Sequence, residues 1–212
     1  MTTLILVRHG YSEANHDGTF TGHRDVGLNE VGCKQAELTA GYIAENYDVD
    51  VIYSSDLKRA YYTAKPLAER LGLDIVSAPE FREINGGEFQ GMSYPELLKR
   101  PEYMVFRNDT GNSVFPGGES MRQVAERVMS KLLEVVEMNS GKTVVITTHA
   151  NPMRVIKTMV KYGNIEEMKN VKGVPNASVT VIEADCGKLS LKVDGYDEYL
   201  GELHTDFSSK RV

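Results

Sequence analysis

The sequence predicts a three-layer α/β/α fold with a mostly parallel central sheet. Two apolar runs, residues 4–7 and 143–148, are short and nearly continuous, which is typical of strands buried on both faces. Segments with helical spacing separate the predicted strands, and this alternation favours parallel βαβ units. The chain has 212 residues, so we expect one domain over residues 1–212.

The first part of the chain supplies three predicted strands, at residues 4–8, 51–53 and 73–76. A polar loop follows the first strand and leads to Asn29, which is predicted to cap a helix over residues 30–46. The next helix is expected to begin at an N-cap formed by Ser55 or Asp56 and to end at Gly72.

A lid-like irregular segment is expected at residues 77–118, which are rich in glycine, proline and aromatic residues. Beyond it, Ser120 and Gln123 form a capping box that opens a helix. Strand 143–148 comes next, and Asn151 is predicted to cap the helix that follows it. Residues 178–183 and 189–193 resemble a closing antiparallel hairpin, and the polar tail from Tyr199 is expected to be loose.

Composition narrows the class of protein. The formal net charge of -6 argues against a nucleic-acid or membrane-surface partner recruited by bulk electrostatics. The two cysteines, Cys33 and Cys186, are far apart in sequence, which favours a reducing, cytoplasmic setting over a disulfide framework. Neither a signal peptide nor a membrane span is expected.

Basic and imidazole side chains follow the predicted strands directly. Arg8 and His9 end the first strand, His149 ends strand 143–148, and Arg59 lies in the first turn of the helix after a third strand. Ligands of open α/β sheets bind at the carboxyl ends of strands, and helix N-termini favour anions. If the two strands are neighbours, these residues predict a pocket for a phosphoryl group.

The residue types suggest a reaction. A neutral imidazole such as His9 can attack phosphorus, while Arg8, Arg59 and His149 compensate the charge on the phosphoryl oxygens. This chemistry requires neither a metal ion nor another cofactor. A carboxyl group is needed to protonate the leaving oxygen, and Glu83 is the first candidate, although spacing alone makes Glu88 nearly as suitable. The expected partner is a small phosphorylated metabolite, with a homodimer as a possible assembly.

Several motifs occur in an order that resembles the histidine phosphatase superfamily, which includes phosphoglycerate mutases and many small phosphatases. They are Val7-Arg8-His9-Gly10 with Ser12 to Asn15, Phe20-Thr21-Gly22, Ser54 to Ala60, Arg82-Glu83, Pro116 to Ser120, and His149 with Arg154. The resemblance implies a phosphoglycerate mutase-like fold and a phosphatase that forms a phosphohistidine.

That resemblance also implies roles for individual residues. His9 corresponds to the nucleophile, Glu83 to the proton donor of the phosphatase branch, and Arg8, Arg59 and His149 to the phosphate clamp. The implied substrate-binding residues are Arg8, Asn15, Thr21, Gly22, Arg59, His149 and Ala150. Ala150 replaces a glycine common in the family but keeps its backbone N–H group.

Three other functions remain open at this stage. A cofactor-dependent phosphoglycerate mutase is the first, although the short chain and the stretch Arg82 to Gly86 favour hydrolysis. The second is a catalytically silent phosphate-binding module, which the presence of all five expected groups disfavours. The third is a metal hydrolase that uses His9, His149 and a carboxylate, which the absence of close His, Asp and Glu ligand spacing disfavours.

Overall fold

The computed structural model describes residues 1–205 and centres on a six-stranded sheet with the order β3-β2-β4-β1-β5-β6. The strands are β1 Thr2–Arg8, β2 Val51–Ser54, β3 Ile75–Ser77, β4 Thr143–Thr148, β5 Val179–Asp185 and β6 Lys188–Tyr196. The pairs among β1 to β4 are parallel, whereas β5 is antiparallel to β1 and β6 is antiparallel to β5. The mostly parallel sheet with an antiparallel closing hairpin is thus confirmed.

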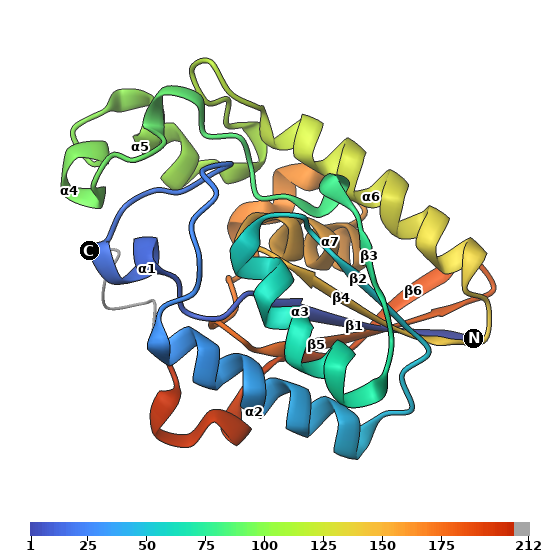
Figure 1. Cartoon of the computed structure of the whole chain (residues 1–212). Coiled ribbons are helices and arrows are strands. Elements are labelled where there is room, and N and C mark those ends of the chain that lie inside the picture. Colours follow the sequence, from blue (N-terminus) through green and yellow to red (C-terminus); the bar gives the residue numbers. More distant parts are fainter. Residues whose placement is uncertain (206–212) are drawn as a thin grey trace.

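Helices cover both faces of the sheet, with α2 and α3 on one side and α6 and α7 on the other (Figure 1). The helices are α1 Glu13–Asp17, α2 Glu30–Asn46, α3 Lys58–Leu71, α4 Tyr94–Leu97, α5 Pro101–Asn108, α6 Met121–Met138 and α7 Ala150–Tyr162. Short 3-10 helices occupy Pro79–Phe81, Gly87–Phe89, Thr110–Asn112, Ile165–Asn170 and Glu198–Leu203. This is the three-layer α/β/α architecture expected from the sequence.

Residues 4–7 of strand β1 are all apolar because both faces of the strand are covered. Leu4 and Leu6 pack in the core that includes residues of α6 and α7, whereas Ile5 and Val7 pack in the core beneath α2 and α3. All four side chains are essentially inaccessible to solvent. Side chains alternate between the faces of a strand, so a continuous apolar run is the expected pattern for this central position.

The segment 77–118 contains only short helices, as its composition predicts. Its two α-helices, α4 and α5, lie at the end of the sheet opposite the N-terminus, on the same side as α1 (Figure 1). Aromatic side chains hold the segment to the loop that precedes α2. Phe20 stacks on Phe115 with a centroid separation of 5.4 Å, and Tyr103 meets Phe20 edge to face at 6.5 Å.

Two predicted helix caps are wrong. Helix α3 starts after Leu57 without a side-chain cap, because Ser55 contacts His149 and Asp56 pairs with Arg82. Helix α7 starts two residues earlier than predicted, and its N-cap is His149 rather than Asn151. These polar side chains serve tertiary contacts instead of local capping.

Other sequence predictions need smaller corrections. The loop after β1 contains the short helix α1, opened by a capping box between Ser12 and Asn15. Strand β3 begins two residues later than predicted and is short. The tail from Tyr199 is not loose at its start, because Leu200 is buried and Tyr199 Oη donates a hydrogen bond to the carbonyl of Ala177. The rest of the predicted tail, residues 206–212, lies outside the described residues.

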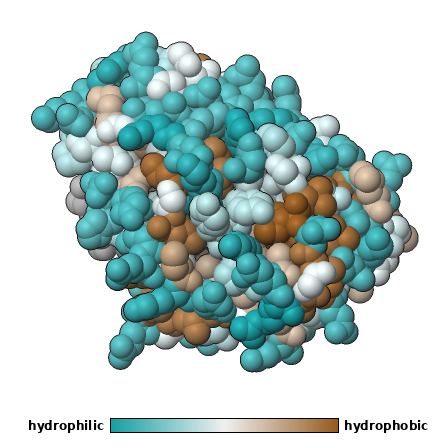
Figure 2. Space-filling model, in the orientation of Figure 1, coloured by the Kyte–Doolittle hydropathy of each residue, from teal (hydrophilic) through white to brown (hydrophobic). Residues whose placement is uncertain are grey.

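The molecular surface is largely hydrophilic on the face seen in Figure 2, and the most extensive of its brown areas lies over the β3 edge of the sheet. Val76 of β3 is among the large hydrophobic residues that are exposed. Within residues 1–205, none of the helices has both the length and the apolar character that a bilayer crossing requires.

Two glycines of α2 give a direct test of the packing. A Cβ atom on Gly32 would lie 2.0 Å from the carbonyl oxygen of Tyr11, whereas at Gly41 the nearest atom is 3.9 Å away. We expect Gly32→Ala to lower the free energy of unfolding by about 1–3 kcal/mol through overpacking. Gly41→Ala should raise it by about 0.5–1 kcal/mol through helix propensity. Urea unfolding of both variants measures the contrast, and equal effects would contradict the close approach.

Candidate active site

The two candidate histidines meet because their strands are neighbours in the sheet. Arg8 of β1 is in register with Thr148 of β4, so His9 and His149 leave adjacent parallel strands at the same edge. Their ring centroids are 5.2 Å apart. Both side chains are buried. The sequence prediction that these residues face one common point is therefore confirmed by the geometry.

His9 is held in one tautomer. Its Nδ1 atom is 2.8 Å from the carbonyl oxygen of Gly10, and because a carbonyl only accepts, Nδ1 carries the proton. The lone pair of the neutral ring then lies on Nε2. Burial, followed by the charges of Arg59 and Arg8, holds the pKa of His9 well below its ordinary value. These effects keep the ring neutral and Nε2 available as a nucleophile.

His149 shares the same environment but has a different partner. Its Nε2 atom is 2.8 Å from the Ser55 hydroxyl, and its buried Nδ1 atom has no hydrogen-bond partner within residues 1–205. Burial, and after it the charge of Arg59, holds the pKa of His149 well below its ordinary value. When Ser55 donates to Nε2, the proton of the neutral ring resides on Nδ1, which can then donate to an anion.

The turn after β1 is fixed from three directions. Asn176 Nδ2 donates to the carbonyl oxygen of His9 at 2.8 Å, and Thr63 Oγ1 accepts from the amide of Gly10 at 2.9 Å. Gly10 also lies against α2, since a Cβ atom there would be 2.6 Å from the carbonyl oxygen of Gly32. The position of the His9 ring is thus set by side chains and backbone from distant parts of the chain.

Two buried guanidinium groups flank the histidines. Arg8 Nη1 donates to the carbonyl of Val174 at 2.6 Å. Arg59 donates to the carbonyls of Gly22 and Arg24 at 2.8 and 2.9 Å. Burial lowers the pKa of Arg59 to about 10, while the charge of Glu83 opposes that change, so Arg59 remains cationic at neutral pH. Both arginines are thereby oriented before any anion binds.

The structure separates the two candidate acids. Glu83 is buried, and its carboxylate accepts the backbone N–H of Ile84 at 2.9 Å and that of Asn151 in the first turn of α7 at 3.3 Å. Glu88 instead points outward, with a side chain that is 63% exposed and 3.8 Å from Arg100. Only Glu83 of these two lines the cavity beside His9.

A cavity of about 440 Å³ opens above the histidines, and the predicted substrate-binding residues Asn15, Thr21, Gly22 and Ala150 all line it. His149 lies against His9 but is not itself part of the lining. The charged side chains of the lining are Arg8, Arg59, Arg154, Lys169, Lys172 and Glu83. This excess of cations creates a local anion site in a chain whose formal net charge is -6.

Several site residues were not found from the sequence. Asn151, Lys169 and Lys172 line the cavity, and Asn176 supports His9 from a loop that precedes β5. Lys169, Lys172 and Asn176 do not directly follow a parallel strand, which was the signal that identified the others. Asn151 does follow β4, but it was interpreted as a helix cap. The aromatics Tyr94, Tyr103 and Phe106 form a wall of the cavity, and each comes from the lid-like segment. Phe115 packs in the core instead.

Metal-ligating side chains do not cluster in the described part of the chain: no three histidine, cysteine, aspartate or glutamate residues there are arranged to hold an ion. Cys33 and Cys186 are exposed free thiols. The cationic side chains that line the cavity belong to arginine and lysine residues.

Comparison with known proteins is consistent with this geometry. Residues 4–195 match the family model of the histidine phosphatase superfamily (branch 1). Phosphoserine phosphatase 1 of Hydrogenobacter thermophilus is 36% identical over 97% of this chain and 98% of its own length. A 2,3-bisphosphoglycerate-dependent phosphoglycerate mutase of Cytophaga hutchinsonii is 30% identical over 81% of this chain and 83% of its own.

A solved structure extends the likeness to the fold. Phosphoserine phosphatase of Entamoeba histolytica, in a mutant form with bound phosphoserine, has a TM-score of 0.84 and 26% identity to this chain. The match covers 94% of this chain and all of the other.

The buried histidines predict an unusual titration. We expect the rings of His9 and His149 to remain neutral at pH 6.5, the ordinary histidine pKa, because burial and the neighbouring arginines disfavour their charged forms. NMR titration of the ring nitrogens in phosphate-free buffer measures this, and His9 should show a protonated Nδ1. Activity that depends on neutral His9 should accordingly persist below pH 6.5. Titration of His9 at or above pH 6.5 would contradict the assigned electrostatics.

Proposed function

The chain belongs to the histidine phosphatase superfamily, and we propose that it hydrolyses small phosphate monoesters through a phosphohistidine on His9. The observation that carries this proposal is the neutral His9 ring, with its Nε2 lone pair in a cavity flanked by two buried arginines. It is an enzyme of the phosphoric monoester hydrolase class. The guanidinium groups supply the positive charge that other phosphatases obtain from metal ions.

The first half-reaction transfers the phosphoryl group to the enzyme. His9 Nε2 attacks phosphorus, the bond to the leaving oxygen breaks, and Glu83 gives that oxygen a proton. Arg8, Arg59 and the Nδ1–H of His149 stabilise the three equatorial oxygens. The backbone N–H of Ala150, at the N-terminus of α7, adds a further donor at the same edge of the sheet.

The second half-reaction frees the enzyme. Glu83 is now a carboxylate, and it accepts a proton from a water molecule as that water attacks phosphorus. The phosphorus–nitrogen bond breaks, His9 regains its lone pair, and inorganic phosphate leaves. Glu83 is suited to both steps because the amides of Ile84 and Asn151 hold its carboxyl group beside the cavity. One residue thus acts as acid and then as base.

The outer part of the cavity supports a proposal for the substrate class. Lys169 and Lys172 are exposed cations on its lining, beyond the buried arginines. A second anionic group on the leaving portion of the substrate would be attracted to them. Phosphoserine, which carries a carboxylate, is therefore the first substrate we propose, in agreement with the names of the relatives.

Variants of His9 and Glu83 test the reaction. His9→Ala should abolish phosphate release without loss of cooperative unfolding, and addition of a chelator to the unmodified enzyme should not lower its activity. Glu83→Gln should lower kcat/KM for an alkyl phosphate by about 10²-fold or more, and much less for p-nitrophenyl phosphate, whose leaving group needs little protonation.

Each of the following results would contradict a different part of the proposed reaction. Substantial turnover by His9→Ala would exclude the covalent mechanism, and an equal loss on both esters would exclude Glu83 as the acid. Interconversion of 3- and 2-phosphoglycerate at a rate above that of phosphate release would instead identify a mutase.

Substitution of the two lysines tests the proposed substrate class. The double variant Lys169→Ala and Lys172→Ala should raise KM for phosphoserine about tenfold, as expected for two lost charge contacts of modest strength. KM for p-nitrophenyl phosphate, which lacks the second anion, should change little. Lys34→Ala, at an exposed position of α2, is the matched control. Equal changes in KM for the two substrates would show that the lysines do not bind a second anionic group.

A further inference from the structure

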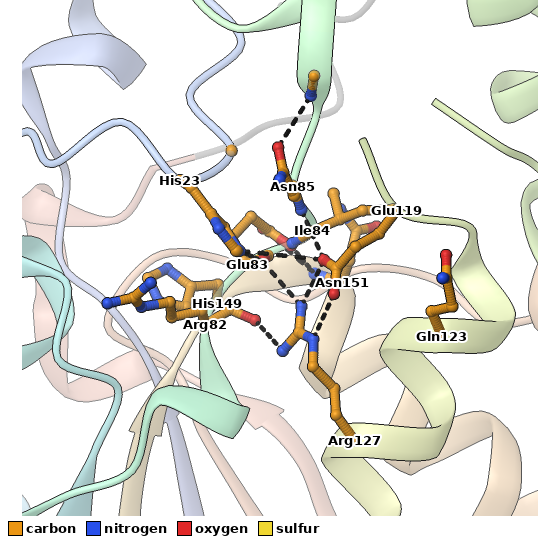
Figure 3. A network of polar contacts seen from close by, with 12 residues as sticks. His23, Arg82, Glu83, Ile84, Asn85, Glu119, Gln123, Arg127, His149 and Asn151 are labelled. Carbon is orange, nitrogen blue, oxygen red and sulfur yellow. Dashed lines mark hydrogen bonds and ion pairs between the residues drawn. The ribbon is translucent and has the colours of Figure 1, made fainter. Parts of the chain in front are cut away.

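The segment that carries Glu83 is held in place from outside the cavity. It covers residues 80–85, which begin within the 3-10 helix Pro79–Phe81, end before the 3-10 helix Gly87–Phe89 and are not part of a strand. An ion pair between Arg127 of α6 and Glu119 lies directly behind it (Figure 3). The Arg127 and Glu119 side chains are each only 20% exposed. Both members of this pair also form hydrogen bonds with the backbone of the segment.

Arg127 uses all five of its N–H groups. Nη1 donates to the carbonyls of Glu80 at 2.6 Å and Arg82 at 2.8 Å, and Nη2 donates to the carbonyl of Glu83 at 2.9 Å. The remaining two donate to the carboxylate of Glu119, at 2.7 and 2.9 Å. A guanidinium group is planar and rigid, so these contacts fix three carbonyl groups of residues 80–83 relative to α6.

Glu119 holds the other end of the segment. Its Oε2 atom accepts the backbone N–H of Asn85 at 2.7 Å, and its own backbone N–H donates to the carbonyl of Asn85 at 2.9 Å. Burial disfavours the charged form, but the hydrogen bonds from Arg127 and Asn85 and the charges of Arg127 and His23 together outweigh it and lower the pKa of Glu119. Glu83 is therefore bracketed, with Arg127 on its N-terminal side and Glu119 on its C-terminal side.

A third contact comes from the loop after β1. His23 Nε2 donates to the carbonyl oxygen of Glu83 at 2.7 Å, so that oxygen accepts from both His23 and Arg127 (Figure 3). The backbone of Glu83 is thus fixed on the side away from the cavity, while its carboxylate is fixed by two amides on the cavity side. A general acid must lie within hydrogen-bond reach of the leaving oxygen, and a misplacement of about 1 Å can cost about 10²-fold in rate.

We propose that Arg127, paired with Glu119, is a positioning residue for the general acid: it holds the backbone of residues 80–85 so that the Glu83 carboxyl group faces the leaving oxygen. This inference rests on the proposed function, in which Glu83 protonates that oxygen. Arg127 is not among the residues that line the cavity, and its five donors go to the backbone carbonyls of Glu80, Arg82 and Glu83 and to the Glu119 carboxylate, so it acts through Glu83.

The test measures how the rate depends on the leaving group. Arg127→Met should lower kcat/KM for an alkyl phosphate by about 10- to 10²-fold and leave kcat/KM for p-nitrophenyl phosphate within about threefold. For the alkyl phosphate, kcat/KM of Arg127→Lys should lie between the values of Arg127→Met and of the unmodified enzyme, because an ammonium group cannot make five fixed contacts. Arg122→Met is the matched control, since Arg122 is on the same helix and forms an exposed ion pair with Glu166. That control should behave like the unmodified enzyme.

Combining variants separates positioning from general stabilisation. The double variant of Arg127→Met and Glu83→Gln should be no slower on the alkyl phosphate than Glu83→Gln alone, because the residue being positioned is already ineffective. If Arg127→Met does not fold, Glu119→Gln keeps the shape of the pair and should show the same selective loss to a smaller extent.

The outcomes against the proposal are distinguishable. An equal loss on both esters by a folded Arg127 or Glu119 variant, or additive losses in the double variant, would overturn the positioning role while leaving Glu83 as the acid. If Glu83→Gln alone is not selective for the poor leaving group, the proposed function fails, and the positioning role fails with it.

Discussion

The parallel pairing of β1 with β4 is the constraint on which the rest of the site depends. The register that opposes Arg8 to Thr148 brings His9 and His149 to one edge of the sheet, 5.2 Å apart between ring centroids. Both strands are central and apolar, so the register is fixed by two cores at once. A slip of one residue would reverse which side chains face each core, and the energetic cost of that reversal preserves the site.

Burial gives these residues their chemistry. Two imidazoles and two guanidinium groups share a region from which water is largely excluded, so the uncharged form of His9 is favoured and its Nε2 becomes a nucleophile. Backbone carbonyls of Gly22, Arg24 and Val174 offset part of the cost of burying the arginines. A phosphoryl group that enters the cavity would offset more of this cost. The buried arginines therefore make the site selective for anions.

The sequence predicted the sheet, its long helices and the meeting of Arg8, His9, Arg59 and His149 at one place, because those features depend on local periodicity and on strand ends. It did not predict the caps of α3 and α7, where Ser55, Asp56 and His149 make tertiary contacts instead. The supporting residues Asn176 and Arg127 were also missed. Each acts through backbone carbonyls far away in sequence, and no spacing rule identifies such a contact. The choice between Glu83 and Glu88 likewise required the fold.

Direct capture of the phosphoenzyme tests the central claim that His9 is a covalent nucleophile. The enzyme would be mixed with phosphoserine or p-nitrophenyl phosphate, quenched in alkali within the first turnovers, digested and examined by mass spectrometry. The account predicts one phosphoryl group on the peptide containing His9, stable in alkali and labile in acid, as a phosphohistidine is. Two results would contradict the account. One is an enzyme that hydrolyses the substrate but yields no phosphorylated peptide when breakdown of the phosphoenzyme is slowed. The other is a phosphoryl group on any residue besides His9.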